Sequence, residues 1–384
     1  MLYGLKNYCL LVSSLLTQAL PPMCPTQSMK KTSIAYPTSP VNWQALQPAP
    51  LQYSRIDPSR LNRWMSSSNQ LQALSLKEIT LPGAHDAGMG IVSQCSDFAN
   101  AAVTQTQKTS FQTMLENGIR YFDVRPMISR TNEMMLGHYR WVGRQVGLGV
   151  KTFNLHNEGC LGYSLESMLM DVKRFLNKGL MAGDREIIFL KMSHFMNFYK
   201  YNHDQSFFDA DDVKRLQHEI KNELKPYLVN KNDFLTTPLK ALTATGPKVI
   251  VTLDTNEPLE AGFHAEHNID IYDEYSNTPL FNKMKKDQFN KIWLSADKHY
   301  SVLSWTLTQS EPMAVGCVLP RSLGYIAGYK CQSIESLSQA SQQGLATLAD
   351  ELDHIKTYPN VLYTDFTGKQ ETQVAIDINE RRLG

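Results

Sequence analysis

Short apolar runs alternate with longer amphipathic stretches along most of this chain. Seven of the runs have the length and the β-branched or apolar content of buried strands, and they lie at residues 79–82, 121–124, 134–137, 186–192, 248–253, 302–307 and 361–363. Helical patterns separate them, and this alternation is typical of parallel strands that are joined by crossover helices. The sequence therefore predicts one α/β domain built around a parallel sheet.

The clearest amphipathic helix is predicted over residues 164–176. Its apolar side chains repeat at helical spacing and share one face. Ser164 is a suitable N-cap for this helix, and Gly179 is a suitable stop. Beyond it, the patterns predict two more helices, at residues 213–228 and 333–355. They also predict a long polar loop at residues 268–286.

The amino-terminal region differs in composition from the rest of the chain. Residues 1–20 resemble a secretory signal, because a lysine precedes a short apolar run that ends in small residues. Residues 21–60 are rich in Pro, Ser, Thr and Gln and predict an extended arm or linker, which leaves residues 61–384 for the folded domain. We expect a secreted or extracellular protein. The alternative is a soluble effector made in the cytoplasm, whose translation starts at Met29.

The length and the net charge of the chain limit the classes of protein to which it can belong. With 384 residues, of which 42% are hydrophobic, the chain can bury a large core, and one α/β barrel fits this length. The formal net charge of +1 gives no reason to expect nucleic acid as a partner. No stretch reaches the roughly eighteen uninterrupted apolar residues of a transmembrane helix, so no transmembrane segment is expected. We expect a monomer.

Four of the six cysteines lie within the predicted domain, at Cys95, Cys160, Cys317 and Cys331. Their even number permits two disulfides, whose pairing the sequence leaves open. Their spacing is not that of a zinc site. We predict that these four residues are reduced and act as small core side chains.

Polar side chains that can do chemistry follow several of the predicted strands. His85 and Asp86 follow the first strand, Arg125 follows the second, His138 follows the third and Asp365 follows the last. In parallel α/β barrels the residues that follow the strands converge on one rim, and that rim carries the active site. We therefore expect these side chains to lie together.

Two histidines and an arginine are a suitable set for cleaving a phosphodiester. One imidazole can act as base and the other as acid, provided that carboxylates fix their tautomers. A guanidinium can bind a phosphate bidentately and stabilise the charge that develops on its oxygens. The set predicts a phosphodiesterase that needs neither a metal ion nor another cofactor.

Three segments, 81–86, 118–125 and 137–139, resemble the X domain of phosphatidylinositol-specific phospholipase C in its bacterial form, and Asp123 and His138 lie fifteen residues apart as in that family. The resemblance covers about residues 70–370. It implies a distorted TIM (β/α) barrel of the phospholipase-C-like phosphodiesterase type. It also implies cleavage of phosphatidylinositol by attack of the inositol 2-hydroxyl on phosphorus at a membrane surface, and it leaves open whether glycosylated inositol anchors are cleaved as well. The products would be diacylglycerol and a cyclic inositol phosphate.

The resemblance also implies a role for each matching residue. His85 would be the general base, oriented by Asp365. His138 would be the general acid, supported by Asp86, and Arg125 would hold the phosphate. The inositol pocket would be lined by Lys191, Asp273 and Tyr275. Calcium would be dispensable, because the eukaryotic relatives have an acidic calcium ligand where this chain has Arg125.

Two departures from the family pattern leave alternatives open. The insertion between His138 and Tyr163 contains His156, which is a second candidate for the acid. We prefer His138 because its distance from Asp123 is the one that the family has. Asp254 stands where a bacterial relative has a basic residue, so the sequence does not identify the lipid headgroup. For Asp123 both a catalytic role and a structural role in anchoring Arg125 remain.

Two rival functions fit parts of the sequence. The first is a glycerophosphodiester or sphingomyelin phosphodiesterase, whose Mg²⁺ would be held by clustered Glu and Asp residues near the first histidine. Glu158 and Glu186 are poorly placed for that. The second is a catalytically silent barrel that binds inositol lipids.

Overall fold

The computed structural model describes residues 58–141, 145–148, 151–154, 157–200, 207–319 and 329–383. It divides into two units, of which one contains the antiparallel hairpin of β5 (Gln145–Leu148) and β6 (Lys151–Asn154), and the other contains the remaining described residues. The predicted signal at 1–20, nearly all of the predicted arm at 21–60, and His156 lie outside the described residues.

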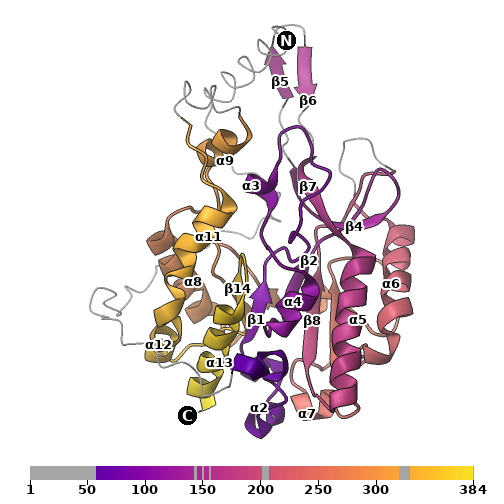
Figure 1. Ribbon diagram of the computed structural model, residues 1–384, viewed down its shortest axis with the longest axis vertical. Coiled ribbons are helices and arrows are strands. Elements are labelled where there is room, and N and C mark those ends of the chain that lie inside the picture. Colours follow the sequence, from indigo (N-terminus) through magenta and orange to yellow (C-terminus); the bar gives the residue numbers. More distant parts are fainter. Residues whose placement is uncertain are drawn as a thin grey trace. The chain divides into compact units, whose positions relative to one another are not determined.

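Eight parallel strands form the central sheet of the larger unit (Figure 1). In chain order they are β1 (Leu81–Ala84), β2 (Tyr121–Val124), β8 (Ile187–Met192), β10 (Lys248–Leu253), β11 (Phe263–Ala265), β12 (Ile271–Tyr272), β13 (Tyr300–Ser304) and β14 (Val361–Thr364). Their order in the sheet is β11-β10-β8-β2-β1-β14-β13-β12, so the last strand pairs with the first. Among the described residues no ladder joins β11 to β12, and the barrel is therefore open between these two strands.

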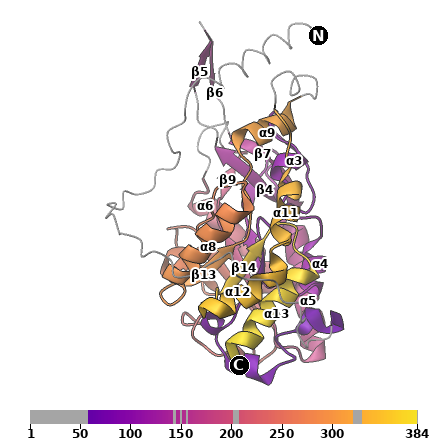
Figure 2. The ribbon, with the colours of Figure 1, turned by 90° about the vertical axis from the view of Figure 1, so that its left-hand side faces the viewer.

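Helices connect the strands and cover the sheet. One group of helices lies on one flank of the barrel and contains α4 (Phe111–Glu116), α5 (Leu165–Ala182) and α6 (Ala210–Leu224). The other group faces the viewer in Figure 2 and contains α8 (Phe281–Ser295), α11 (Ile334–Gln342), α12 (Leu345–Ile355) and α13 (Lys369–Leu383). The shorter helices are η1 (Pro58–Arg63), α2 (Asn69–Ala73), η2 (Leu76–Glu78), α3 (Ala101–Thr104), η3 (Lys225–Tyr227), α7 (Leu239–Leu242), η4 (Glu266–Asn268) and α9 (Glu311–Val318).

The alternation of side chains along the strands creates two cores. Tyr121, Phe189 and Tyr300 fill the interior of the barrel together with Trp64. Their neighbours in sequence, such as Phe122 and Leu190, point outward and pack against the helices. Because the interior is filled, the only polar side chains that the strands can present to a ligand are those near their ends.

A second sheet of four strands lies beside the barrel, in the order β7-β4-β3-β9. Its strands are β3 (Pro126–Ile128), β4 (Met134–Trp141), β7 (Asn157–Ser164) and β9 (Met196–Asn197). The prediction that residues 134–137 form a parallel strand of the main sheet is therefore wrong, since β4 is antiparallel to both β3 and β7. The connection from β3 is a tight turn in which Asn132 has a φ of 64°, and so short a connection cannot make a parallel crossover.

Several predicted helix limits also need correction. Ser164 caps α5 as predicted, but the helix continues past Gly179 and ends at Gly183, whose φ is 71°. The predicted helix at 333–355 is two helices that are separated at Gly344, where a Cβ would lie 2.3 Å from the Phe281 ring. The stretch 268–286, predicted as a loop, contains β12 and the start of α8.

The four cysteines of the domain form two disulfides, Cys95–Cys160 and Cys317–Cys331, so the prediction of reduced cysteines is wrong. Cys95 and Cys160 are 65 residues apart in sequence, yet an antiparallel bridge brings their Cα atoms to 4.0 Å. Such a contact depends on the tertiary fold, and for this reason the local sequence pattern did not show it.

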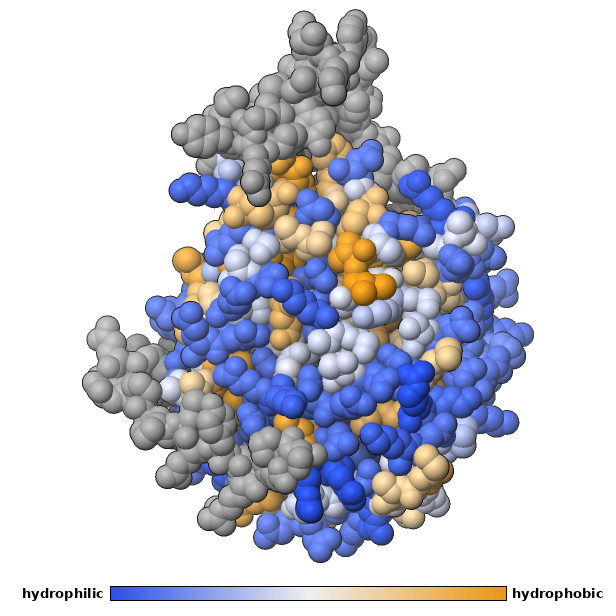
Figure 3. All heavy atoms as spheres, viewed as in Figure 1, coloured by the Kyte–Doolittle hydropathy of each residue, from blue (hydrophilic) through white to orange (hydrophobic). Residues whose placement is uncertain are grey.

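The surface of the larger unit is uneven in hydropathy. Figure 3 shows that hydrophobic residues gather over α3 and β7, whereas the region around α2 and α7 is mostly hydrophilic. Ile91, in the segment that precedes α3, is 46% exposed. No helix among the described residues is both long and apolar enough to cross a bilayer.

Candidate active site

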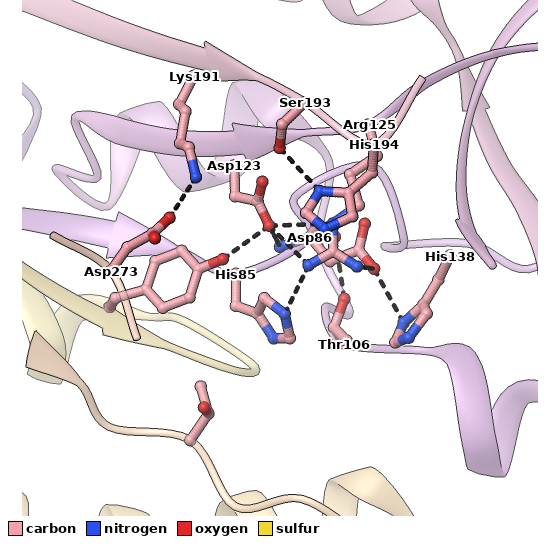
Figure 4. Close-up of polar contacts among 12 residues, drawn as sticks. His85, Asp86, Thr106, Asp123, Arg125, His138, Lys191, Ser193, His194 and Asp273 are labelled. Atoms are coloured by element: carbon pink, nitrogen blue, oxygen red, sulfur yellow. Dashed lines mark hydrogen bonds and ion pairs between the residues drawn. The ribbon is translucent and has the colours of Figure 1, made fainter. Parts of the chain in front are cut away.

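The ends of three neighbouring strands bring most of the candidate residues together (Figure 4). His85 and Asp86 follow β1, Arg125 follows β2, and Asp365 follows β14. Since β1 lies between β2 and β14, with Ala84 opposite both Phe122 and Thr364, these side chains emerge side by side.

His85 is held from both sides of its ring. Its Nδ1 lies 2.7 Å from Oδ1 of Asp365, and its Nε2 lies 3.0 Å from Nη2 of Arg125. Because a guanidinium can only donate, Nε2 must accept, which assigns the ring proton to Nδ1. Burial alone would lower the pKa of His85, but the carboxylate of Asp365 outweighs this effect and the pKa is raised.

His138 reaches the same place from β4. Its Nδ1 lies 2.8 Å from Oδ2 of Asp86, in a contact that is not aligned as a hydrogen bond and that is an ion pair when the ring is protonated. Asp86 is fully buried, has a left-handed φ of 45° and lies 3.2 Å from Nη1 of Arg125. Burial would raise the pKa of Asp86, but Arg125 and His138 outweigh it and the pKa is lowered. His138 thus belongs to the second sheet and not to the end of a barrel strand.

Asp123 fixes the guanidinium of Arg125. Oδ2 of Asp123 accepts hydrogen bonds from Nε and Nη2 of Arg125 at 3.2 and 3.0 Å. The same oxygen accepts one from the Tyr363 hydroxyl at 2.6 Å and one from the main-chain N–H of Asp86 at 3.1 Å. Despite burial, Arg125 holds the pKa of Asp123 far below its ordinary range. These contacts are those of a structural anchor.

The two histidines and the arginine of this cluster are more exposed to solvent than its carboxylates. The side chains of His85, His138 and Arg125 are 20%, 21% and 12% exposed. Those of the three carboxylates behind them are at most 3% exposed, namely Asp86, Asp123 and Asp365. The centroids of the two imidazole rings are 6.4 Å apart. An anion the size of a phosphate can therefore contact both rings and the guanidinium, while the carboxylates stay out of its reach.

A second group of charges lies on the next strand. Lys191 stands opposite Asp123 in the register of β2 and β8, and it forms ion pairs with Asp273 and, at 3.3 Å, with Glu266. Burial would lower the pKa of Lys191, but Asp273 and Glu266 outweigh it and the pKa is raised. Burial raises the pKa of Glu266 to about 7.

Tyr275 lies apart from these contacts. This residue is 58% exposed, and its main-chain carbonyl accepts a hydrogen bond from Nζ of Lys291 at 3.0 Å. The structure therefore brings together Lys191 and Asp273 of the predicted inositol pocket but does not join the Tyr275 ring to them.

Three contributors were not selected from the sequence. Tyr363 lies on β14, two residues before Asp365. The alternation of side chains along a strand could have indicated that the Tyr363 ring points into the barrel. Glu266 belongs to a short 3₁₀ helix without a pattern of its own. Gln107 donates to the His85 carbonyl at 2.8 Å and accepts from the Thr367 N–H at 2.9 Å, and no sequence signal indicates that it joins these two loops.

His194 lies close enough to Arg125 for the guanidinium to lower its pKa, and its Nδ1 is 2.8 Å from the Ser193 hydroxyl. Among the described residues, no three His, Cys, Asp or Glu side chains are grouped so that they could hold a metal ion. The second candidate acid, His156, lies outside the described residues.

Comparison with solved structures relates this architecture to known proteins. The phosphatidylinositol-specific phospholipase C from Listeria monocytogenes is similar over 82% of this chain and 97% of its own, with 18% sequence identity and a TM-score of 0.53. A phosphatidylinositol-specific phospholipase C from Staphylococcus aureus is similar over 84% of this chain and 99% of its own, with 15% identity and a TM-score of 0.53. No protein family model and no curated protein matches the chain. The likeness shows the fold, which is a distorted TIM barrel of the phospholipase C type.

Proposed function

We propose that this protein is a phosphodiesterase of the phosphatidylinositol-specific phospholipase C family, with an X-domain barrel at residues 61–384. It cleaves phosphatidylinositol to diacylglycerol and a cyclic inositol phosphate without a metal ion. One observation carries the proposal: His85 and His138 are each backed by a buried carboxylate, and Arg125 lies between them. The likeness to solved phosphatidylinositol-specific phospholipases C supports the choice of substrate.

In the proposed reaction, Nε2 of His85 takes the proton of the inositol 2-hydroxyl, and the resulting oxygen attacks phosphorus. The bond from phosphorus to the glycerol oxygen breaks, and His138 gives a proton to that leaving oxygen. The hydroxyl proton thus ends on His85, and the proton of His138 ends on diacylglycerol. Each acid or base role is typically worth about a hundredfold to ten-thousandfold in rate. The Nδ1–H assignment of His85 supports the base role, because it makes Nε2 the basic nitrogen; in this structure Nε2 accepts from Arg125, and in the reaction the inositol 2-hydroxyl takes the place of that donor.

Arg125 supplies the positive charge that the phosphate needs. Its guanidinium can contact phosphate oxygens and stabilise the charge that develops on them. The metal-dependent rival would require free carboxylates near His85. Asp86 and Asp123, the carboxylates on either side of Arg125, are already engaged by it, and this favours the metal-independent reaction.

The headgroup would bind beside this cluster. An ammonium and a carboxylate can respectively donate to and accept from the hydroxyls of inositol, and we assign these roles to Lys191 and Asp273. We propose that the exposed Tyr275, whose ring does not contact these two residues in the structure, covers the inositol ring when the substrate is bound. Glycosylated inositol anchors are a second proposed substrate. Asp254 directly follows β10 and is exposed, and it places a negative charge at a position where a bacterial relative has a basic residue, so we do not restrict the headgroup to plain inositol.

A lipid surface is the proposed partner. The exposed Ile91 and the apolar helix α9 support this, and α9 is joined to α3 by the Asn100 side chain, which donates to the Cys317 carbonyl at 3.0 Å. The helix α3 belongs to the more hydrophobic region seen in Figure 3. Two disulfides support secretion, because such bonds persist in oxidising compartments. We propose that the protein acts as a secreted monomer that binds the membrane peripherally.

The proposal is tested by incubating the purified protein with phosphatidylinositol vesicles in excess chelator and measuring diacylglycerol. Release at the same rate with and without chelator is the expected result. Activity that the chelator abolishes and Mg²⁺ restores would favour the metal-dependent rival. Binding to the vesicles without release of diacylglycerol would favour a silent lipid-binding barrel.

A further inference from the structure

The loop that follows Asp86 is covalently tied to the sheet that carries His138. Cys95, in this loop, forms a disulfide with Cys160 on β7. Cys160 stands directly opposite His138 in the β4–β7 ladder, and Cys95 stands opposite Cys160 in an antiparallel bridge. The three residues therefore lie in one row across three neighbouring segments, and cross-strand partners of this kind project from the same face.

Main-chain hydrogen bonds accompany the disulfide. The N–H groups of Ser93 and Ser96 donate to the carbonyls of Leu161 and Gly159 at 2.8 and 2.9 Å, and the N–H of Leu161 donates to Gln94 at 3.1 Å. The segment is nevertheless an exposed edge, because Gln94 and Cys95 are both open to solvent. Such short, solvent-exposed pairings open readily, and the disulfide is the covalent link that keeps this edge attached when they do.

The disulfide and the contact between Asp86 and His138 join the same two parts of the chain at two points. Close packing lies between these points: a Cβ at Gly162 would lie 2.1 Å from the Gly88 carbonyl oxygen. A small separation of the loop from β7 would therefore open the 2.8 Å gap between Nδ1 of His138 and Oδ2 of Asp86. Misplacement of a reacting group by about 1 Å can cost about a hundredfold in rate.

We propose that the Cys95–Cys160 disulfide is a positioning element for His138, which holds its imidazole against Asp86 and thereby fixes the direction of its proton donation. The proposal rests on the proposed function for the role of His138. Cys317–Cys331 offers a matched control for the loss of a disulfide, because it joins the end of α9 to the segment before α11, and neither carries a residue of the histidine and arginine cluster. Since α9 belongs to the proposed lipid-binding surface, the rates are compared on a substrate that does not require binding to a membrane.

Kinetics on two substrates separate positioning from general damage. The Cys95→Ser/Cys160→Ser double variant is compared with Cys317→Ser/Cys331→Ser and with the wild type. One substrate is short-chain phosphatidylinositol dispersed as monomers; the other is an inositol phosphodiester with a phenol leaving group, which departs without help from an acid. We expect kcat on phosphatidylinositol to fall at least about tenfold in the first variant and kcat on the phenol ester to fall less than about threefold. Equal losses on both substrates, or the same pattern in the control, would overturn the proposal.

The position of the proton on His138 gives a readout that does not depend on activity. Imidazole ¹⁵N shifts, assigned with a His138→Gln variant, report the tautomer of the neutral ring. We expect the Nδ1–H form in the wild type and the Cys317/Cys331 variant, and a shift towards Nε2–H when the Cys95–Cys160 bond is absent. An unchanged tautomer contradicts the positioning role. If the wild type cleaves neither substrate, the proposed function fails, and this measurement still decides the inference.

If the Cys95→Ser/Cys160→Ser variant does not fold, the same bond is broken by chemical reduction of the folded protein. Cys95 is exposed to a dithiol reagent, which gives two electrons and two protons to the disulfide and becomes a cyclic disulfide itself. The Cys317→Ser/Cys331→Ser background restricts the reaction to the bond of interest. Reoxidation should restore both the rate on phosphatidylinositol and the Nδ1–H tautomer. Full activity and an unchanged tautomer in the reduced state would contradict the proposal.

Discussion

His85 and Asp365 are 280 residues apart in the sequence, yet Nδ1 of one lies 2.7 Å from Oδ1 of the other. The pairing of the first and last barrel strands causes this proximity, since the His85 N–H donates to the Thr364 carbonyl at 3.0 Å. Asp365 can therefore orient His85, the proposed base, only when the first and last strands of the barrel are paired.

The first prediction concerns the two histidines. His85→Ala and His138→Ala should each lower kcat on phosphatidylinositol by at least about a hundredfold, because each removes one proton-transfer group. His156→Ala should leave kcat within about threefold. Rates of diacylglycerol release from vesicles check this, with circular dichroism to verify the fold. A large loss in His156→Ala together with an active His138→Ala would transfer the acid role to the insertion.

The second prediction concerns pH. Because Asp365 raises the pKa of His85, the acidic limb of kcat/KM should lie above the ordinary imidazole pKa of about 6.5. His85 must be deprotonated to act as base, so activity should rise as pH increases through that limb.

Asp365→Asn removes the charge that stabilises the imidazolium, and it should therefore move the acidic limb to lower pH while lowering kcat. Asp233→Asn, an exposed carboxylate paired with Lys231, is the control and should leave the profile unchanged. A limb in Asp365→Asn that stays in place, or that moves to higher pH, would show that another group controls it.

The third prediction concerns Arg125. Arg125→Lys keeps the positive charge but removes the planar fork, so it loses bidentate contact with phosphate. We expect kcat/KM to fall about a hundredfold or more, as for loss of a transition-state donor. Arg130→Lys alters an exposed arginine on the neighbouring turn and should have no effect. Wild-type kinetics in Arg125→Lys would exclude bidentate recognition.

The fourth prediction concerns stability. Tyr363→Phe removes the hydrogen bond to buried Asp123 and should lower the free energy of unfolding by about 1 to 3 kcal/mol. Tyr300→Phe is the matched control, because the buried Tyr300 hydroxyl has no hydrogen-bond partner among the described residues, and its loss should cost little. Urea denaturation measures both. A similar effect of the two substitutions would mean that the bond to Asp123 contributes nothing.

Local sequence patterns predicted much of this architecture. Strand alternation and polar residues after strands located β1, β2, β8, β10 and β14 within a few residues, together with the side chains that follow three of them. These features depend on periodicity and on neighbouring residues, which a sequence shows directly. The assembly of His85, Arg125 and Asp365 then follows from the rule that parallel strands end at one rim.

The remaining features depend on contacts between distant segments. His138 was expected at the end of a barrel strand, but a tight turn places it in an antiparallel sheet. The partners of Cys95 and Gln107 are set by loops that meet only in the folded chain. Glu266 takes its raised pKa from burial, which no local pattern reports.

The central claim is that two imidazoles and a guanidinium cleave one phosphodiester without a metal ion. Phosphorus NMR of phosphatidylinositol treated with the protein in excess chelator tests it most directly. We predict a new resonance of a five-membered cyclic phosphate, which the His85→Ala variant does not produce. Absence of this resonance with the wild-type protein, or its appearance at the wild-type rate with His85→Ala, would contradict the account.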